Sequence, residues 1–81
     1  MKGTRKYVDE TEELWLDGGE YGQDSRGVWM ARPPGGHLGD LSNHDVTEHE
    51  DGTITVSPSI LITGEGGSWH GYLERGVWTK V

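Results

Sequence analysis

The chain has 81 residues, of which 31% are hydrophobic, and it contains no cysteine. A domain of this size buries only a small core, and without thiols it has no disulfides or thiolate metal ligands to reinforce that core. Seven basic and fourteen acidic residues give a net charge of −7, which repels phosphate backbones and anionic lipid surfaces. We therefore expect a single β domain over residues 1–81, without direct binding to nucleic acid or membranes.

The first part of the chain predicts an N-terminal arm and one short strand. We expect residues 1–12 to form the arm, either flexible or paired at a sheet edge. The apolar run Leu14-Trp15-Leu16 is closed by Asp17-Gly18-Gly19, so it is too short for a three-turn helix. We predict a strand over residues 12–17, with one helical turn as the alternative.

A repeated tetrapeptide, R-G-V-W, occurs at residues 26–29 and again at residues 75–78. Each copy predicts a glycine with positive φ, followed at once by a strand that carries a large ring. The first of these strands, residues 26–32, should end at the Pro-Pro-Gly-Gly sequence of residues 33–36, because proline cannot donate to a β ladder.

The sequence Asp51-Gly52 lies between two alternating runs, residues 44–50 and 53–57, and predicts a β-hairpin. With a two-residue turn, His49 would lie opposite Ile54, and Thr47 opposite Val56. These four side chains would share the inward face, which would place His49 at the edge of the core.

The last third of the chain predicts two further strands and a second hairpin. Residues 57–59 (S-P-S) should separate two strands, and residues 60–63 (I-L-I-T) should form a strand buried on both faces. A three-residue loop at 74–76 would close the last hairpin and pair Tyr72 with Trp78. The predicted fold is all-β, a small antiparallel sandwich or open barrel of about six to seven strands.

Chemistry-bearing residues are few. A histidine metal site needs three or four converging ligands, and the four histidines (His37, His44, His49 and His70) show no recognised ligand spacing. No serine lies in a G-x-S-x-G elbow. We therefore predict no catalytic residue, no metal ligand and no cofactor, and retain a histidine-based metal-binding or catalytic domain as an alternative.

Four tryptophans and three tyrosines exceed what a core of this size readily buries. Exposed rings on a β surface are typical of contact sites for proteins or sugars. We predict Trp15, Tyr21 and Trp29, in the less regular half, as exposed protein-binding residues. Two alternatives remain open, namely a carbohydrate-binding module and a core that takes up every ring in place of the absent Phe.

Three motifs in the last third, S-P-S-I-L-I (57–62), W-H-G-Y-L (69–73) and G-V-W (76–78), occur in a characteristic order and spacing. In these motifs the chain resembles a family of small proteins encoded by bacteriophages, especially those of actinobacteria, and by prophages. The resemblance implies a phage origin and an all-β fold, and it implies no activity.

These observations predict a non-enzymatic protein-binding module of a phage, found in the host cytoplasm or in the virion. Its partner would be a host factor or a phage structural protein, and self-association into a homo-oligomer is also open. The salt dependence of binding distinguishes the host-directed role from the virion role. Binding of a basic host protein by an acidic surface should weaken with salt, whereas a virion component assembled through aromatic residues should tolerate it.

Overall fold

The computed structural model describes residues 1–9 and 11–81, and in these residues the chain forms eight strands and no helix. The strands are β1 (Thr4–Lys6), β2 (Glu20–Gln23), β3 (Trp29–Ala31), β4 (Gly39–Asp40), β5 (Asp45–Glu48), β6 (Ile54–Gly64), β7 (Gly67–Glu74) and β8 (Val77–Lys80). The all-β prediction is confirmed, with eight strands rather than six or seven. Among the described residues there is no helix long and apolar enough to cross a membrane.

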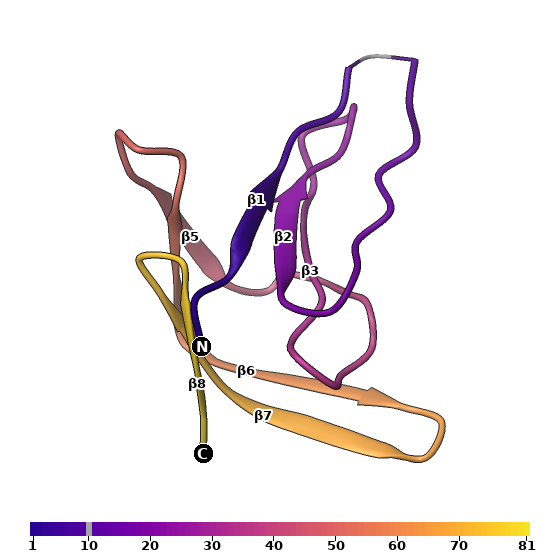
Figure 1. The fold of residues 1–81 in the computed structure, drawn as a ribbon, viewed down its shortest axis with the longest axis vertical. Helices are drawn as coiled ribbons and strands as arrows, with labels where there is room; N and C mark the ends of the chain where they lie inside the picture. Colours follow the sequence, from indigo (N-terminus) through magenta and orange to yellow (C-terminus); the bar gives the residue numbers. More distant parts are fainter. Residues whose placement is uncertain (10) are drawn as a thin grey trace.

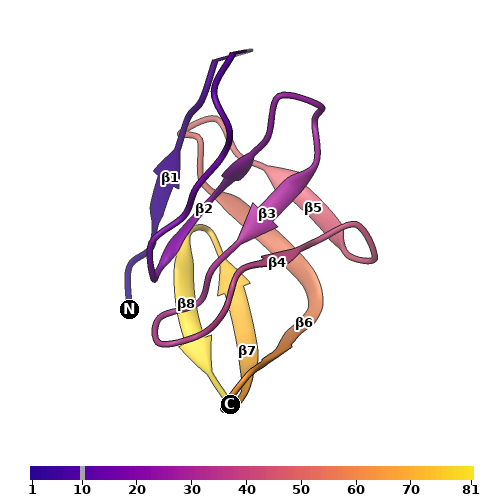
Figure 2. The ribbon, with the colours of Figure 1, turned by 90° about the vertical axis from the view of Figure 1, so that its right-hand side faces the viewer.

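The strands form two four-stranded sheets, in the orders β1-β2-β3-β4 and β5-β6-β7-β8 (Figures 1 and 2). Strand β1 pairs parallel with β2 and every other pair of neighbouring strands is antiparallel, so the second sheet is antiparallel as predicted and the first is mixed. The core takes side chains from both sheets. Its centre is a T-shaped pair of indoles, Trp69 and Trp78, whose centroids are 5.3 Å apart.

The N-terminal segment joins the two sheets. The ammonium group of Met1 donates to Trp78 O (2.8 Å), and Trp78 N donates to Met1 O (2.7 Å). Gly3 N donates to Gly76 O (2.7 Å), and β1 then continues along β2. The arm is therefore paired at an edge, which is the second of the two predicted alternatives.

The predicted strand at residues 12–17 is wrong, and the competing helical turn is also absent there. Both edges of β2 are already paired, one with β1 and the other with β3, so this segment cannot pair with β2. It runs instead as irregular chain that buries Leu16 completely and leaves Trp15 exposed.

The two R-G-V-W segments adopt the predicted conformation at their glycines. Gly27 and Gly76 have φ of 85° and 76°, and each precedes a strand, β3 and β8 respectively. Arg75 also has positive φ (45°), so the last hairpin closes through a two-residue turn rather than a three-residue loop. The predicted pairing of Tyr72 with Trp78 is therefore wrong. Trp78 pairs with Leu73.

The first predicted hairpin exists, but its register differs by one residue. His49 N donates to Thr53 O (2.8 Å), so the loop has three residues and ends at Gly52, whose φ is 86°. Ile54 consequently lies opposite Glu48 rather than His49. Because side chains alternate along a strand, this shift moves His49 off the face that carries Ile54.

Strand β6 is continuous over eleven residues, so residues 57–59 do not separate two strands as predicted. The pairing of β6 with β7 shifts between Val56 and Ile60, which marks a β-bulge. The exposed Pro58 lies in this bulge, where its missing N–H removes no ladder bond, and the Ser57–Pro58 peptide bond is cis.

Beyond the bulge only one face of β6 is buried. Ile60 and Ile62 point into the core, while Leu61 between them is exposed. The prediction of a strand buried on both faces is therefore wrong, because an antiparallel sheet in a two-sheet fold is covered on one side only.

Arg5 of β1 reaches across to the β5–β6 hairpin of the other sheet. Its Nη1 donates to Glu48 Oε2 and to Gly52 O, both at 2.8 Å. The guanidinium carbon lies 4.4 Å from the ring centroid of Tyr7 and 4.7 Å from that of Trp29. Only 11% of the Arg5 side chain is exposed, whereas 49% of the Glu48 side chain is, so the bond to Gly52 O is better shielded from water than the ion pair with Glu48.

We predict that Arg5→Ala lowers the free energy of unfolding by about 2–4 kcal/mol, because it removes charge-assisted hydrogen bonds and two cation–π contacts. Arg26→Ala is the control, since the Arg26 side chain is 85% exposed and its Nη2 lies 3.9 Å from Asp24 Oδ2. It should change stability by less than about 0.5 kcal/mol. Urea denaturation followed by tryptophan fluorescence measures both, and equal effects of the two variants would contradict this assignment.

Candidate docking surface

The three aromatic residues predicted as a protein-binding set do not form one surface. Tyr21 is 1% exposed, so its predicted exposure is wrong, and burial raises the pKa of its phenol. Trp29 is half-buried and packs against the core and Arg5. Trp15 is 58% exposed, as predicted, with the Arg32 guanidinium 5.6 Å from its centroid. Only Trp15 is thus available as a largely free ring.

Each of the four histidines has its own hydrogen-bond partner atom, and two of these atoms belong to the same residue, Ser59. The Nε2 atom lies near a carbonyl or hydroxyl oxygen in each case: His37 with Glu65 O (2.9 Å), His44 with Ser59 O (3.1 Å), His49 with Thr55 Oγ1 (2.7 Å) and His70 with Ser59 Oγ (3.0 Å). Among the described residues no three His, Asp or Glu side chains come together to hold a metal ion. The arrangement indicates imidazoles that tie loops and strands together.

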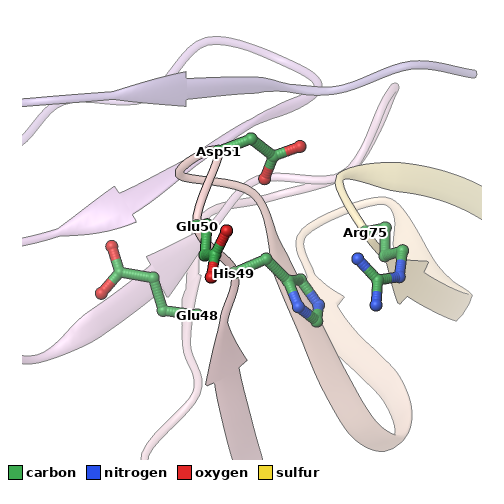
Figure 3. Close-up of a pocket in the computed structure, with 5 residues that line it drawn as sticks. All are labelled: Glu48, His49, Glu50, Asp51 and Arg75. Carbon is green, nitrogen blue, oxygen red and sulfur yellow. The ribbon is translucent and has the colours of Figure 1, made fainter.

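An open hollow of about 570 Å³ lies beside the β5–β6 turn, lined by Glu48, His49, Glu50, Asp51 and Arg75. Figure 3 shows the His49 ring turned toward Arg75, while the Glu48 carboxylate points away from both. Backbone N of Arg75 donates to Thr55 Oγ1 (3.0 Å), the hydroxyl that also bonds His49. The hollow is polar and open to water, so it suits a loose electrostatic contact better than an enclosed ligand.

Three turns share the motif D-x-[ST], in which the Asp carboxylate accepts hydrogen bonds from the residue two positions later. Asp51 Oδ1 accepts from Thr53 N (3.0 Å) and Thr53 Oγ1 (2.6 Å). The same bonds link Asp9 to Thr11 and Asp40 to Ser42. These hydrogen bonds to the charged form hold the pKa of all three carboxyl groups below the ordinary value.

Exposed apolar side chains also lie on the outward side of β6, β7 and β8. Strand β7 alternates strictly, with Trp69, Gly71 and Leu73 buried and the residues between them exposed. We define the outer face as the outward residues of the three strands from Ser59 onward, together with the C-terminal residue: Ser59, Leu61, Thr63, Ser68, His70, Tyr72, Glu74, Val77, Thr79 and Val81. Four of them are large apolar side chains left exposed: Leu61, Tyr72, Val77 and Val81.

These apolar side chains are neighbours across the strands. Leu61 lies opposite His70, and Val81 N donates to His70 O (3.0 Å), so Leu61, His70 and Val81 form one row. Tyr72, which is 43% exposed, lies in the next row opposite Thr79. A hollow of about 260 Å³ next to Tyr72 opens over the β6 bulge. The outer face thus combines apolar anchors, hydroxyl groups and a recess that can receive a side chain.

Most charges of the chain lie away from this face. Residues 1–51 contain five basic and twelve acidic residues, a net charge of 5 − 12 = −7. Residues 52–81 contain two of each, a net charge of 2 − 2 = 0. Within residues 52–81, all of which the structure describes, Glu74 is the one acidic residue on the outward side of a strand, and it lies at the end of β7 beside the turn. The outer face therefore carries a single carboxylate, that of Glu74 beside the recess next to Tyr72, in an acidic protein.

Sequence reasoning missed the outer face. The apolar run at residues 60–63 predicted a strand buried on both faces, although Leu61 and Thr63 are exposed. The signal that identifies it is the period-two pattern of residues 68–73, in which large apolar or glycine positions alternate with Ser68, His70 and Tyr72.

Comparisons of the chain with family models, with curated proteins and with solved structures gave no match. The fold is a small β-sandwich, and one of its two sheets presents the outer face.

We predict that Asp51→Asn reduces the loss of stability in acid. Because Asp51 has a folded-state pKa below its ordinary value of 3.8, its stabilising contribution is present above that pH and disappears as the pH falls through the folded pKa. The melting temperature of the wild type should therefore fall more steeply between pH 5 and pH 2 than that of Asp51→Asn. Glu50→Gln is the control, since it removes a neighbouring charge without altering the bonds to Thr53. Melting temperatures that fall equally steeply with pH in wild type and Asp51→Asn would contradict this prediction.

Proposed function

We propose that this protein is a non-enzymatic protein-binding module of bacteriophage origin, and that it docks through the outer face. The observation that carries the proposal is a sheet face with four exposed large apolar side chains and a single carboxylate, on a chain of net charge −7. Contiguous exposed apolar area on a small protein is typical of a contact site. Depletion of charge at its centre is typical of the interior of protein interfaces.

The chemistry of the face suits a protein partner. Leu61 and Tyr72 supply aliphatic and aromatic anchors, and the recess beside Tyr72 can receive an anchor in return. The hydroxyls of Ser68 and Thr79 lie at the periphery, where polar groups can hydrogen-bond to a partner or to water.

This surface favours a component of the phage particle, with a phage structural protein as its partner. Contacts made by apolar side chains do not depend on charge, so they persist at high ionic strength. A second candidate function is a host-directed accessory protein that binds a basic host factor. It is favoured by the net charge of −7 in residues 1–51 and by the carboxylates around the hollow in Figure 3.

We predict that the tagged protein retains phage structural proteins from a lysate of phage-infected cells equally well at 50 mM and 500 mM NaCl. Leu61→Asp should reduce this retention at least about tenfold, because docking would bury an unpaired carboxylate. Leu38→Asp is the matched control. It makes the same substitution at an exposed leucine outside the outer face and should leave retention unchanged. Quantitative mass spectrometry of the retained proteins provides the readout.

Two results would contradict this assignment. Retention that is the same for Leu61→Asp and wild type would remove the outer face as the docking site. Retention of a basic host protein that is lost at 500 mM NaCl, and is insensitive to Leu61→Asp, would favour the accessory function of the acidic residues.

A further inference from the structure

We infer that the occupant of the outer face is a second copy of this chain, so that the protein forms a two-fold dimer with the two outer faces packed together. The inference rests on the proposed function in one respect, namely that the outer face is a docking surface. It adds that the phage structural protein bound by the outer face is this chain itself, and that the pair is two-fold symmetric.

The distribution of charge selects this arrangement. In a two-fold interface the same patch meets itself, so a face with the single carboxylate of Glu74, at the end of β7, meets an identical face. A head-to-tail contact would instead place the outer face against another surface of the chain. Residues 1–51 hold twelve of the fourteen acidic residues, and covering them with an apolar face would desolvate charges.

The edge of the sheet beside the outer face is partly closed. At Trp78 both backbone groups of β8 are taken by Met1, with distances of 2.7 Å and 2.8 Å. Lys2 forms the adjacent bridge to Val77. A second chain therefore cannot extend the sheet by pairing at this part of β8, and the face of the sheet is the surface that remains open.

Packing of two sheets face to face is also the geometry that such a surface fits. Outward side chains of two sheets interdigitate at a separation of roughly 10 Å, as in a sandwich core. The row of Leu61, His70 and Val81 and the adjacent Tyr72 would supply the centre of this layer. The recess over the bulge would receive a side chain of the other copy.

The size of the face sets the expected affinity. Eight residues of β7 span roughly 26 Å, and three strands span about 14 Å, so the outline is small beside the ~800 Å² that each partner contributes to a standard interface. We therefore expect a reversible dimer with a Kd between about 1 and 100 µM.

Sedimentation equilibrium of the purified protein from 5 to 500 µM tests the inference, at 50 mM and 500 mM NaCl. We expect a monomer–dimer equilibrium that is tighter at the higher salt, because screening weakens the repulsion between two chains of charge −7. Leu61→Asp should weaken the dimer at least about tenfold, and Leu38→Asp, which adds the same charge elsewhere, should change Kd by less than about threefold. Circular dichroism verifies that both variants are folded.

A protein that stays monomeric at 500 µM and at both salt concentrations would overturn the inference. So would a dimer that Leu61→Asp leaves intact. The two proposals fail separately. A monomeric protein that still retains phage proteins through Leu61 would overturn the dimer and support the docking function, whereas a Leu61-dependent dimer that retains no phage protein would do the reverse.

Discussion

The first six residues hold the two sheets together, and the rest of the structure depends on that junction. Met1 hydrogen-bonds to β8 and Gly3 to the turn before it, and the next three residues pair with β2. The guanidinium of Arg5 then reaches the β5–β6 turn through Glu48 and the carbonyl of Gly52. The indole N–H of Trp78 donates to Gly19 O at 2.9 Å and adds a buried bond between the sheets. These polar bonds add to the stability that the small apolar core supplies.

The same junction explains why one sheet face is left uncovered. The first sheet and the N-terminal segment cover the inner side of β6, β7 and β8, and no further element of the described chain lies over the outer side. The acidic residues concentrate in the first 51 residues, in turns such as the one that holds Asp51. The outer face thus carries only one carboxylate, that of Glu74, and the concentration of negative charge in residues 1–51 favours assembly through β6, β7 and β8.

Much of the fold was predictable because local chemistry fixes it. Gly27 and Gly76 take the positive φ that their tetrapeptides predict. The hairpin registers were not predictable, because adding or removing one loop residue moves every side chain of the strand to the opposite face of the sheet. Gly52 ends a three-residue loop, so His49 does not lie on the core face. Arg75 belongs to a two-residue turn, so Tyr72 faces solvent. For the candidate site, the exposure of Trp15 was predicted, whereas Tyr21 proved to be a core residue and the outer face emerged only from tertiary packing.

The central claim is that the outer face is where this protein meets another chain. The most direct measurement is a series of ¹H–¹⁵N correlation spectra of the uniformly labelled protein at 20 and 400 µM in 500 mM NaCl. We expect the amide chemical shifts of Leu61, His70 and Tyr72 to change with concentration, and those of residues 48–51 to stay unchanged. Shifts confined to residues 48–51, or spectra that do not change with concentration, would contradict it.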